Sequence, residues 1–123
     1  MRREKVYDLE ERTYRFARDC RLLMKQLPRT LNNLEDGRQL IKASGSVEAN
    51  YIEANEKLGR NDLIMRLKIA RKEAKEASYW LRLIKEMNST QDAEVAKLLG
   101  EAIELKNILS SIINQMSRVE KHC

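Results

Sequence analysis

With 123 residues, the chain is long enough to bury one sizeable core and too short for a second domain. Charged residues make up 35% of it, whereas only four glycines and one proline are present, which favours long charged helices over a turn-rich β fold. No stretch approaches the roughly eighteen apolar residues of a membrane-spanning helix, and no apolar leader follows the charged amino terminus. We therefore expect one soluble cytoplasmic domain over residues 1–123, neither secreted nor inserted in a membrane.

The first predicted helix begins at Asp8 and ends before Pro28. Asp8 and Glu11 have the spacing of a capping box, and proline disfavours the helical conformation of the residue before it. Between these ends, core candidates recur at alternating steps of four and three residues: Leu9, Thr13, Phe16, Cys20, Leu23 and Leu27. This spacing places one apolar face along the whole helix.

The second predicted helix covers about residues 31–58, after Thr30 as its N-cap. Its core candidates are Leu34, Ile41, Val47, Tyr51, Ala54 and Leu58. Gly45 interrupts this series, and because glycine inside a helix costs about 1 kcal/mol relative to alanine, it indicates a kink or, as we favour, close packing of the backbone. Gly59 is expected to cap the end of this helix, and Asn61 to open the next.

The third and fourth helices have the clearest periodicity. Core candidates of the third are Leu63, Leu67, Ala70, Ala74, Ala77, Leu81 and Ile84. After a polar connection at residues 89–92, those of the fourth are Val95, Leu98, Ala102, Leu105, Leu109, Ile112, Met116 and Val119. Four helices of similar length with short connections predict an all-α, antiparallel up-down-up-down four-helix bundle.

Some apolar residues lie beside these core series: Tyr79, Trp80, Leu99, Ile103, Ile108 and Ile113. They either fill the wider apolar stripe of an ordinary bundle helix or form a second buried surface between copies of the chain. We favour the second interpretation and expect a homo-oligomer.

Short motifs spread over residues 5–85 carry a resemblance to a known family. They include ERTYRFA at residues 11–17, ANYIEA at residues 49–54 and KEAKEASYWL at residues 72–81. In combination they resemble the four-helix-bundle proteins encoded in intervening sequences of bacterial 23S ribosomal RNA genes, which are often named S23 ribosomal proteins.

The resemblance implies a homopentamer of up-down bundles. Proteins of this family are similar to the accessory protein of diversity-generating retroelements, a basic pentamer that engages nucleic acid and a reverse transcriptase. As partners the resemblance therefore implies further copies of the chain, RNA or DNA, and a protein such as a reverse transcriptase.

Basic residues are concentrated in the first and third predicted helices. Residues 1–30 hold nine Lys or Arg against five acids, residues 61–88 hold seven against four, and residues 31–60 and 89–123 each hold one more acid than base. Helical spacing gathers many of these cations on one side of each helix. The candidate nucleic-acid-binding residues are Lys68, Arg71, Lys72, Lys75 and Arg82 in the third helix and Arg15, Arg18, Arg21 and Lys25 in the first.

Two interpretations of these cations are open. They can neutralise phosphates, and repetition around an oligomer would multiply that effect. Alternatively they form a solvated face and pair with neighbouring acids such as Glu73, Glu76 and Asp19. The net charge of +5 is modest, and we expect no aromatic residues interleaved with the cations.

A polar cluster in the second helix is another candidate site: Ser44, Ser46, Asn50, Tyr51, Glu53 and Asn55. Buried polar groups require hydrogen-bond partners, so we expect these side chains to be satisfied structurally. A ligand pocket is the alternative, although nothing in the sequence specifies a ligand.

Catalytic chemistry has few candidate groups. His122 is the only histidine, so neither a Ser-His-Asp arrangement nor the Glu-x-x-His pairs of di-iron bundles can be formed, and no glycine-rich phosphate loop is present. Arg118 and His122 are spaced more closely than the Arg and His of helical HEPN-type ribonucleases. Cys20 lies in a core series and is expected to be a buried, unreactive thiol in a reducing compartment. We expect neither a metal nor another cofactor.

These observations predict a non-enzymatic, oligomeric helical protein whose basic helix faces bind RNA or DNA, as an accessory to a nucleic-acid-handling partner. The alternative is a protein–protein scaffold that does not bind nucleic acid. Salt dependence separates the two, because phosphate contacts release counterions and an apolar interface does not.

Overall fold

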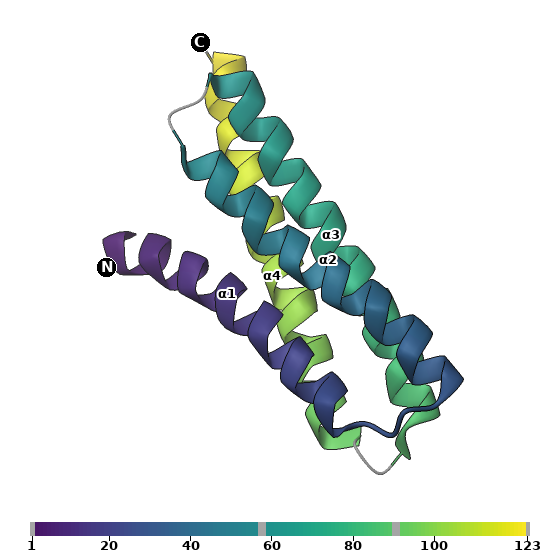
Figure 1. The fold of residues 1–123 in the computed structure, drawn as a ribbon. Helices are drawn as coiled ribbons and strands as arrows, with labels where there is room; N and C mark the ends of the chain where they lie inside the picture. Colours follow the sequence, from purple (N-terminus) through teal and green to yellow (C-terminus); the bar gives the residue numbers. More distant parts are fainter. Residues whose placement is uncertain (1, 57–58, 90–91, 123) are drawn as a thin grey trace.

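Four helices form the protein in the computed structural model: α1 (Arg2–Gln26), α2 (Leu31–Asn55), α3 (Arg60–Met87) and α4 (Asp92–His122). The structure describes the backbone of residues 2–56, 59–89 and 92–122, and side chains within residues 9–56, 59–89 and 93–118. Each helix packs against the next in sequence and α1 also packs against α4, whereas in the described part the backbones of α1 and α3, and those of α2 and α4, do not approach closely. This arrangement confirms the predicted up-down-up-down four-helix bundle (Figure 1).

Three expected helix ends were wrong. α1 begins at Arg2 rather than Asp8, because residues 2–7 contain no helix breaker and the helix continues through them. Gly59 is not a C-terminal cap of α2; it is the N-cap of α3, the place expected for Asn61, and its φ of −60° and ψ of 157° are extended values. α2 ends earlier, at Asn55, and the Glu56 N–H donates to the Glu53 carbonyl at 3.2 Å, so a left-handed glycine is not required.

The core series of α1 is buried throughout, and so are most members of the α3 and α4 series. Leu63, Ile112 and Met116 are only partly buried beside the core, and Ile113 is buried instead of lying outside it. The expected core positions Leu58 and Val119 lie outside the described residues and the described side chains, respectively.

The core face of α2 differs from the expected one. Leu34 is 45% exposed and Ile41 is only partly buried. The buried face instead comprises Asn33, Gly37, Leu40, Ala43, Ser44, Val47, Asn50, Tyr51 and Ala54. Three of its first five members are polar or lack a side chain, so an apolar pattern could not reveal this half of the face.

Gly45 marks close packing, as expected, because α2 continues through it without interruption. A Cβ atom at Gly45 would lie 3.2 Å from Nη2 of Arg21 on α1. Gly37 also lies against a side chain of α1, since a Cβ atom there would lie 2.5 Å from Cε of Met24. The two glycines therefore leave room for the ends of the Arg21 and Met24 side chains of α1 against α2.

Toward its N-terminus, α1 diverges from the other three helices (Figure 1). Arg12 connects this part of α1 to α4: its Nη2 lies 2.7 Å from Oε1 of Glu101, its Nε donates to Oε2 of the same carboxylate at 3.1 Å, and Glu104 lies 3.2 Å away. The hydrogen bond to Glu101 is the first cause of the raised pKa of Arg12.

A buried amide pair joins the start of α2 to the end of α3. Asn33 donates to Oδ1 of Asn88 at 2.8 Å, and Asn88 donates to Oδ1 of Asn33 at 2.7 Å. The second N–H of each amide is also used, by the Pro28 carbonyl at 2.9 Å and the Ile84 carbonyl at 2.8 Å. All four amide hydrogens are thus satisfied in a buried position.

Candidate nucleic-acid interface

The five basic candidates of α3 form what we term the α3 basic surface: Lys68, Arg71, Lys72, Lys75 and Arg82. Four of them are exposed and Arg71 is partly buried. The buried residues of α3 occupy the other side of the helix, with Leu67, Ala74 and Leu81 seven residues apart at its centre. Because residues three, four and seven apart share one side of a helix, the cations form a continuous stripe.

The cations of the α3 basic surface are not used by the fold. Within residues 9–56, 59–89 and 93–118, none of the five charged side-chain groups takes part in a hydrogen bond or an ion pair; the Ser78 hydroxyl donates only to the backbone carbonyl of Lys75. Lys72 only exerts a longer-range attraction on Glu73, whose pKa is nevertheless raised, first by burial and then by Glu76. The alternative interpretation, in which these cations form ion pairs with Glu73 and Glu76, is therefore wrong for the α3 basic surface.

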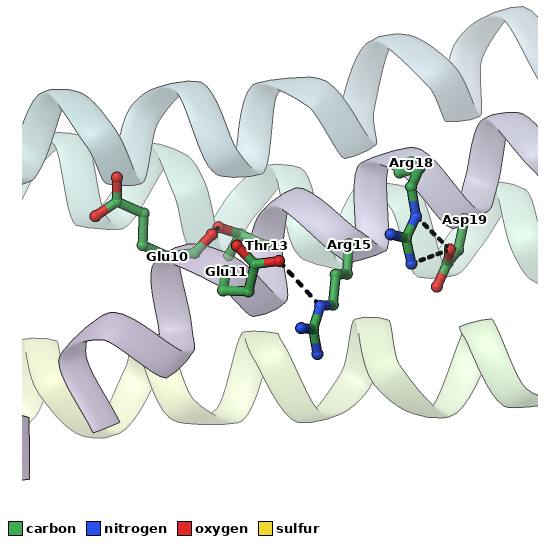
Figure 2. Close-up of polar contacts among 6 residues, drawn as sticks. All are labelled: Glu10, Glu11, Thr13, Arg15, Arg18 and Asp19. Atoms are coloured by element: carbon green, nitrogen blue, oxygen red, sulfur yellow. Dashed lines mark hydrogen bonds and ion pairs between the residues drawn. The ribbon is translucent and has the colours of Figure 1, made fainter. Parts of the chain in front are cut away.

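The four candidates of α1, which we term the α1 basic surface, are in a different state. Nε of Arg15 lies 3.0 Å from Oε2 of Glu11, and Nη2 of Arg18 lies 3.0 Å from Oδ1 of Asp19 (Figure 2). Arg21 donates to the carbonyl of Ala17 at 2.9 Å and to that of Ile41 at 3.5 Å.

Lys25, the fourth member of the α1 basic surface, is exposed in the last turn of its helix. A cation in this position interacts favourably with the carboxyl end of the helix. The α1 basic surface therefore offers fewer uncommitted charges than the α3 basic surface, although exposed ion pairs of this kind are weak.

Tyr79 is a functional candidate that the sequence analysis missed. It is 52% exposed and lies seven residues after Lys72, four after Lys75 and three before Arg82, which places it on the α3 basic surface. Its ring contacts Trp80 edge to face, with centroids 4.8 Å apart and planes at 72°. The expectation that no aromatic residue is interleaved with the cations was wrong; the four-and-three spacing from Lys72 through Arg82 is the signal that identifies Tyr79.

The polar cluster of α2 is satisfied by the fold, as expected. Ser44 donates to the Ile41 carbonyl at 3.2 Å, and Asn50 donates to the Ser46 carbonyl at 2.9 Å and to its hydroxyl at 3.0 Å. Arg66 of α3 donates to Oδ1 of Asn50 at 3.2 Å. Of the remaining members, Tyr51 is buried, whereas Glu53 and Asn55 are exposed.

Cys20 is fully buried and reduced, and burial raises the pKa of its thiol to about 12. The expectation of a buried thiol is confirmed. Among the described residues, no group of His, Cys, Asp and Glu is arranged to hold a metal ion. In the same part of the chain, none of the helices has the length and apolar character needed to span a bilayer.

The apolar residues beside the core series fall into three groups. Tyr79 and Ile103 are exposed, whereas Trp80, Leu99 and Ile108 are partly buried against the core and Ile113 belongs to it. The surface available for a second interface is therefore smaller on α4 than the sequence predicts.

Comparisons with known proteins agree with this architecture. A family model described as 23S rRNA-intervening sequence protein matches residues 5–111, which include both basic surfaces. The chain is also similar to the crystal structure of a protein of unknown function from the S23 ribosomal protein family of Bacteroides thetaiotaomicron. The two share 27% identity over 85% of this chain and 97% of that chain, with a TM-score of 0.75. No curated protein matches the chain.

Proposed function

The chain belongs to the 23S rRNA-intervening sequence protein family, and we propose that it is a non-enzymatic protein that binds RNA or DNA through its α3 basic surface. The main support is that five cationic side chains share one side of a single helix. Their charged groups have no ion-pair or hydrogen-bond partner among the described residues. Phosphate contacts made by such cations require no native contact to be broken, and they release counterions from the nucleic acid.

Self-association is the second part of the proposal, with a homopentamer as the first expectation from the family resemblance. It is supported by large apolar side chains that remain exposed on α3 and α4, among them Met65, Met87 and Ile103. A symmetric assembly would repeat the α3 basic surface and multiply its attraction for phosphates. Light scattering at high micromolar concentration tests this part, and a species of monomer size alone would contradict it.

The cellular role that fits such a protein is that of an accessory to a nucleic-acid-handling protein, such as a reverse transcriptase, in the bacterial cytoplasm. The buried reduced Cys20 is compatible with a reducing compartment. The competing function is a protein–protein scaffold, and the same exposed apolar residues favour it, since they could bind an unrelated protein instead of another copy.

Binding assays at increasing salt distinguish the two functions. Fluorescence anisotropy with a structured RNA and with a duplex DNA should reveal binding at low salt. The logarithm of the affinity should fall linearly with the logarithm of the salt concentration, by about 0.9 for each phosphate contact on duplex DNA. Absence of binding at low salt would favour the scaffold, and so would affinity that salt does not change.

A further inference from the structure

Tyr79 gives the α3 basic surface a feature that a purely electrostatic contact does not need. On a helix with a rise of about 1.5 Å per residue, Lys75 precedes Tyr79 by about 6 Å along the axis and Arg82 follows it by about 4.5 Å. The aromatic ring therefore lies between cations on the same side of α3, and about half of its surface is exposed to solvent.

The ring of Tyr79 is also held in place. It contacts the ring of Trp80 edge to face, and Trp80 is itself partly buried and packed against the core. The Tyr79 hydroxyl forms no hydrogen bond with any described residue, so no polar interaction of the fold explains an exposed tyrosine here. A restrained aromatic ring loses little conformational freedom when a second ring stacks on it.

We infer that Tyr79 stacks on an unpaired nucleobase while the neighbouring cations Lys75 and Arg82 bind the phosphates on either side of it. This inference rests on the proposed function and names its ligand class: single-stranded nucleic acid, including loops, in preference to duplex. In a duplex the faces of the bases cover one another, whereas a single strand exposes them to aromatic side chains. Because every base has such a face, the preference is for strandedness and not for sequence.

Three probes of equal length test the inference: oligothymidylate, the same sugar–phosphate strand without bases, and a duplex. The protein should bind oligothymidylate most tightly. Tyr79→Ala should weaken this affinity by about 5- to 150-fold, the range measured for loss of one base–aromatic stack, and should leave the affinity for the abasic strand unchanged. Tyr79→Phe keeps the ring and should restore the affinity.

Tyr14 on α1 provides a matched control. It is a tyrosine of similar exposure, 50%, outside the α3 basic surface, so Tyr14→Ala should not change the affinity for any probe. Trp80 is the only tryptophan and lies against Tyr79, so its emission should respond to oligothymidylate and not to the abasic strand. Circular dichroism and light scattering confirm that each variant keeps the fold and assembly of the parent.

The outcomes separate the two proposals. The stacking inference is overturned if the parent binds the abasic strand as tightly as oligothymidylate, or if Tyr79→Ala binds oligothymidylate like the parent. Should Tyr79→Ala fail to fold, a Tyr79→Phe variant with Trp80 emission unresponsive to oligothymidylate would overturn it as well. In each of these cases binding to phosphates remains, whereas a parent protein that binds none of the probes at low salt overturns the proposed function too.

Discussion

α1 and α3 carry basic residues at similar helical spacing, but the fold uses their charges differently. Three of the four cations of the α1 basic surface are hydrogen bonded, to Glu11, Asp19 or backbone carbonyls. The five cations of the α3 basic surface have no such partners among the described residues. Net charge per segment, +4 against +3 by sequence, therefore ranks the two surfaces in the opposite order to their numbers of unpaired cationic side chains among the described residues.

The largest expected effect is on the free energy of unfolding, and it tests whether the side of α3 opposite its basic surface packs into the core. Leu67 is 2% exposed, so Leu67→Ala should lower the free energy of unfolding by about 2–5 kcal/mol, through lost burial and a cavity. Met65, two residues away and exposed, is the matched control, and Met65→Ala should cost less than about 0.5 kcal/mol. Urea denaturation measures both, and similar values for the two variants would contradict the assigned orientation of α3.

A smaller effect concerns the amide pair that connects the α1–α2 turn with the end of α3. Asn33→Ala removes one partner and leaves the buried amide of Asn88 without its hydrogen bonds to Asn33, so it should cost about 1–3 kcal/mol. The neighbouring Asn32 is exposed, and Asn32→Ala should change stability by less than about 0.5 kcal/mol. A cost for Asn33→Ala no larger than that of the control would show that the pair is not formed in solution.

Within α1, an ion pair to another helix should contribute more to the free energy of unfolding than an ion pair within the helix. Arg12→Ala breaks the partly buried, two-pronged contact with Glu101 on α4 and should cost about 1–2 kcal/mol. Arg15→Ala breaks only an exposed pair within the helix and should cost about 0.3–0.5 kcal/mol. Repeating the urea titrations at high salt should reduce both values, and an Arg15 cost above that of Arg12 would refute this order.

The sequence predicted α3 well because its buried positions are apolar and follow strict steps of four and three residues. It failed for the first half of α2, where Asn33, Gly37 and Ser44 occupy core positions that only hydrogen bonding or close packing explains. For the site, the positions of the cations were predictable and their use was not. Asp19 was named from the sequence as one acid with which the cations could pair, but its partner is Arg18, the adjacent residue, a spacing at which helical side chains do not normally face each other.

The smallest effect near neutral pH concerns the buried side of α1. Because the pKa of Cys20 is raised from 9.0 to about 12, its thiol contributes stability that is fully present below about pH 9 and is lost as the pH rises toward 12. In a Cys123→Ser background, a thiol reagent should label Cys20 slowly at pH 8 and rapidly after addition of urea. Rapid labelling of the folded protein would mean that α1 does not pack as described.

The measurement that tests the central claim most directly compares two triple variants that remove the same charge. Lys68→Gln, Lys72→Gln and Lys75→Gln neutralise three members of the α3 basic surface; Arg15→Gln, Arg18→Gln and Lys25→Gln neutralise three of the α1 basic surface. The salt dependence of duplex DNA binding is measured for both and for the parent. The α3 variant should weaken binding similarly across sequences and flatten the salt slope by about 2 to 3, whereas the α1 variant should change it by less than about 1. Equal slopes for the α3 variant and the parent, with a flattened slope for the α1 variant, would contradict the assignment to α3.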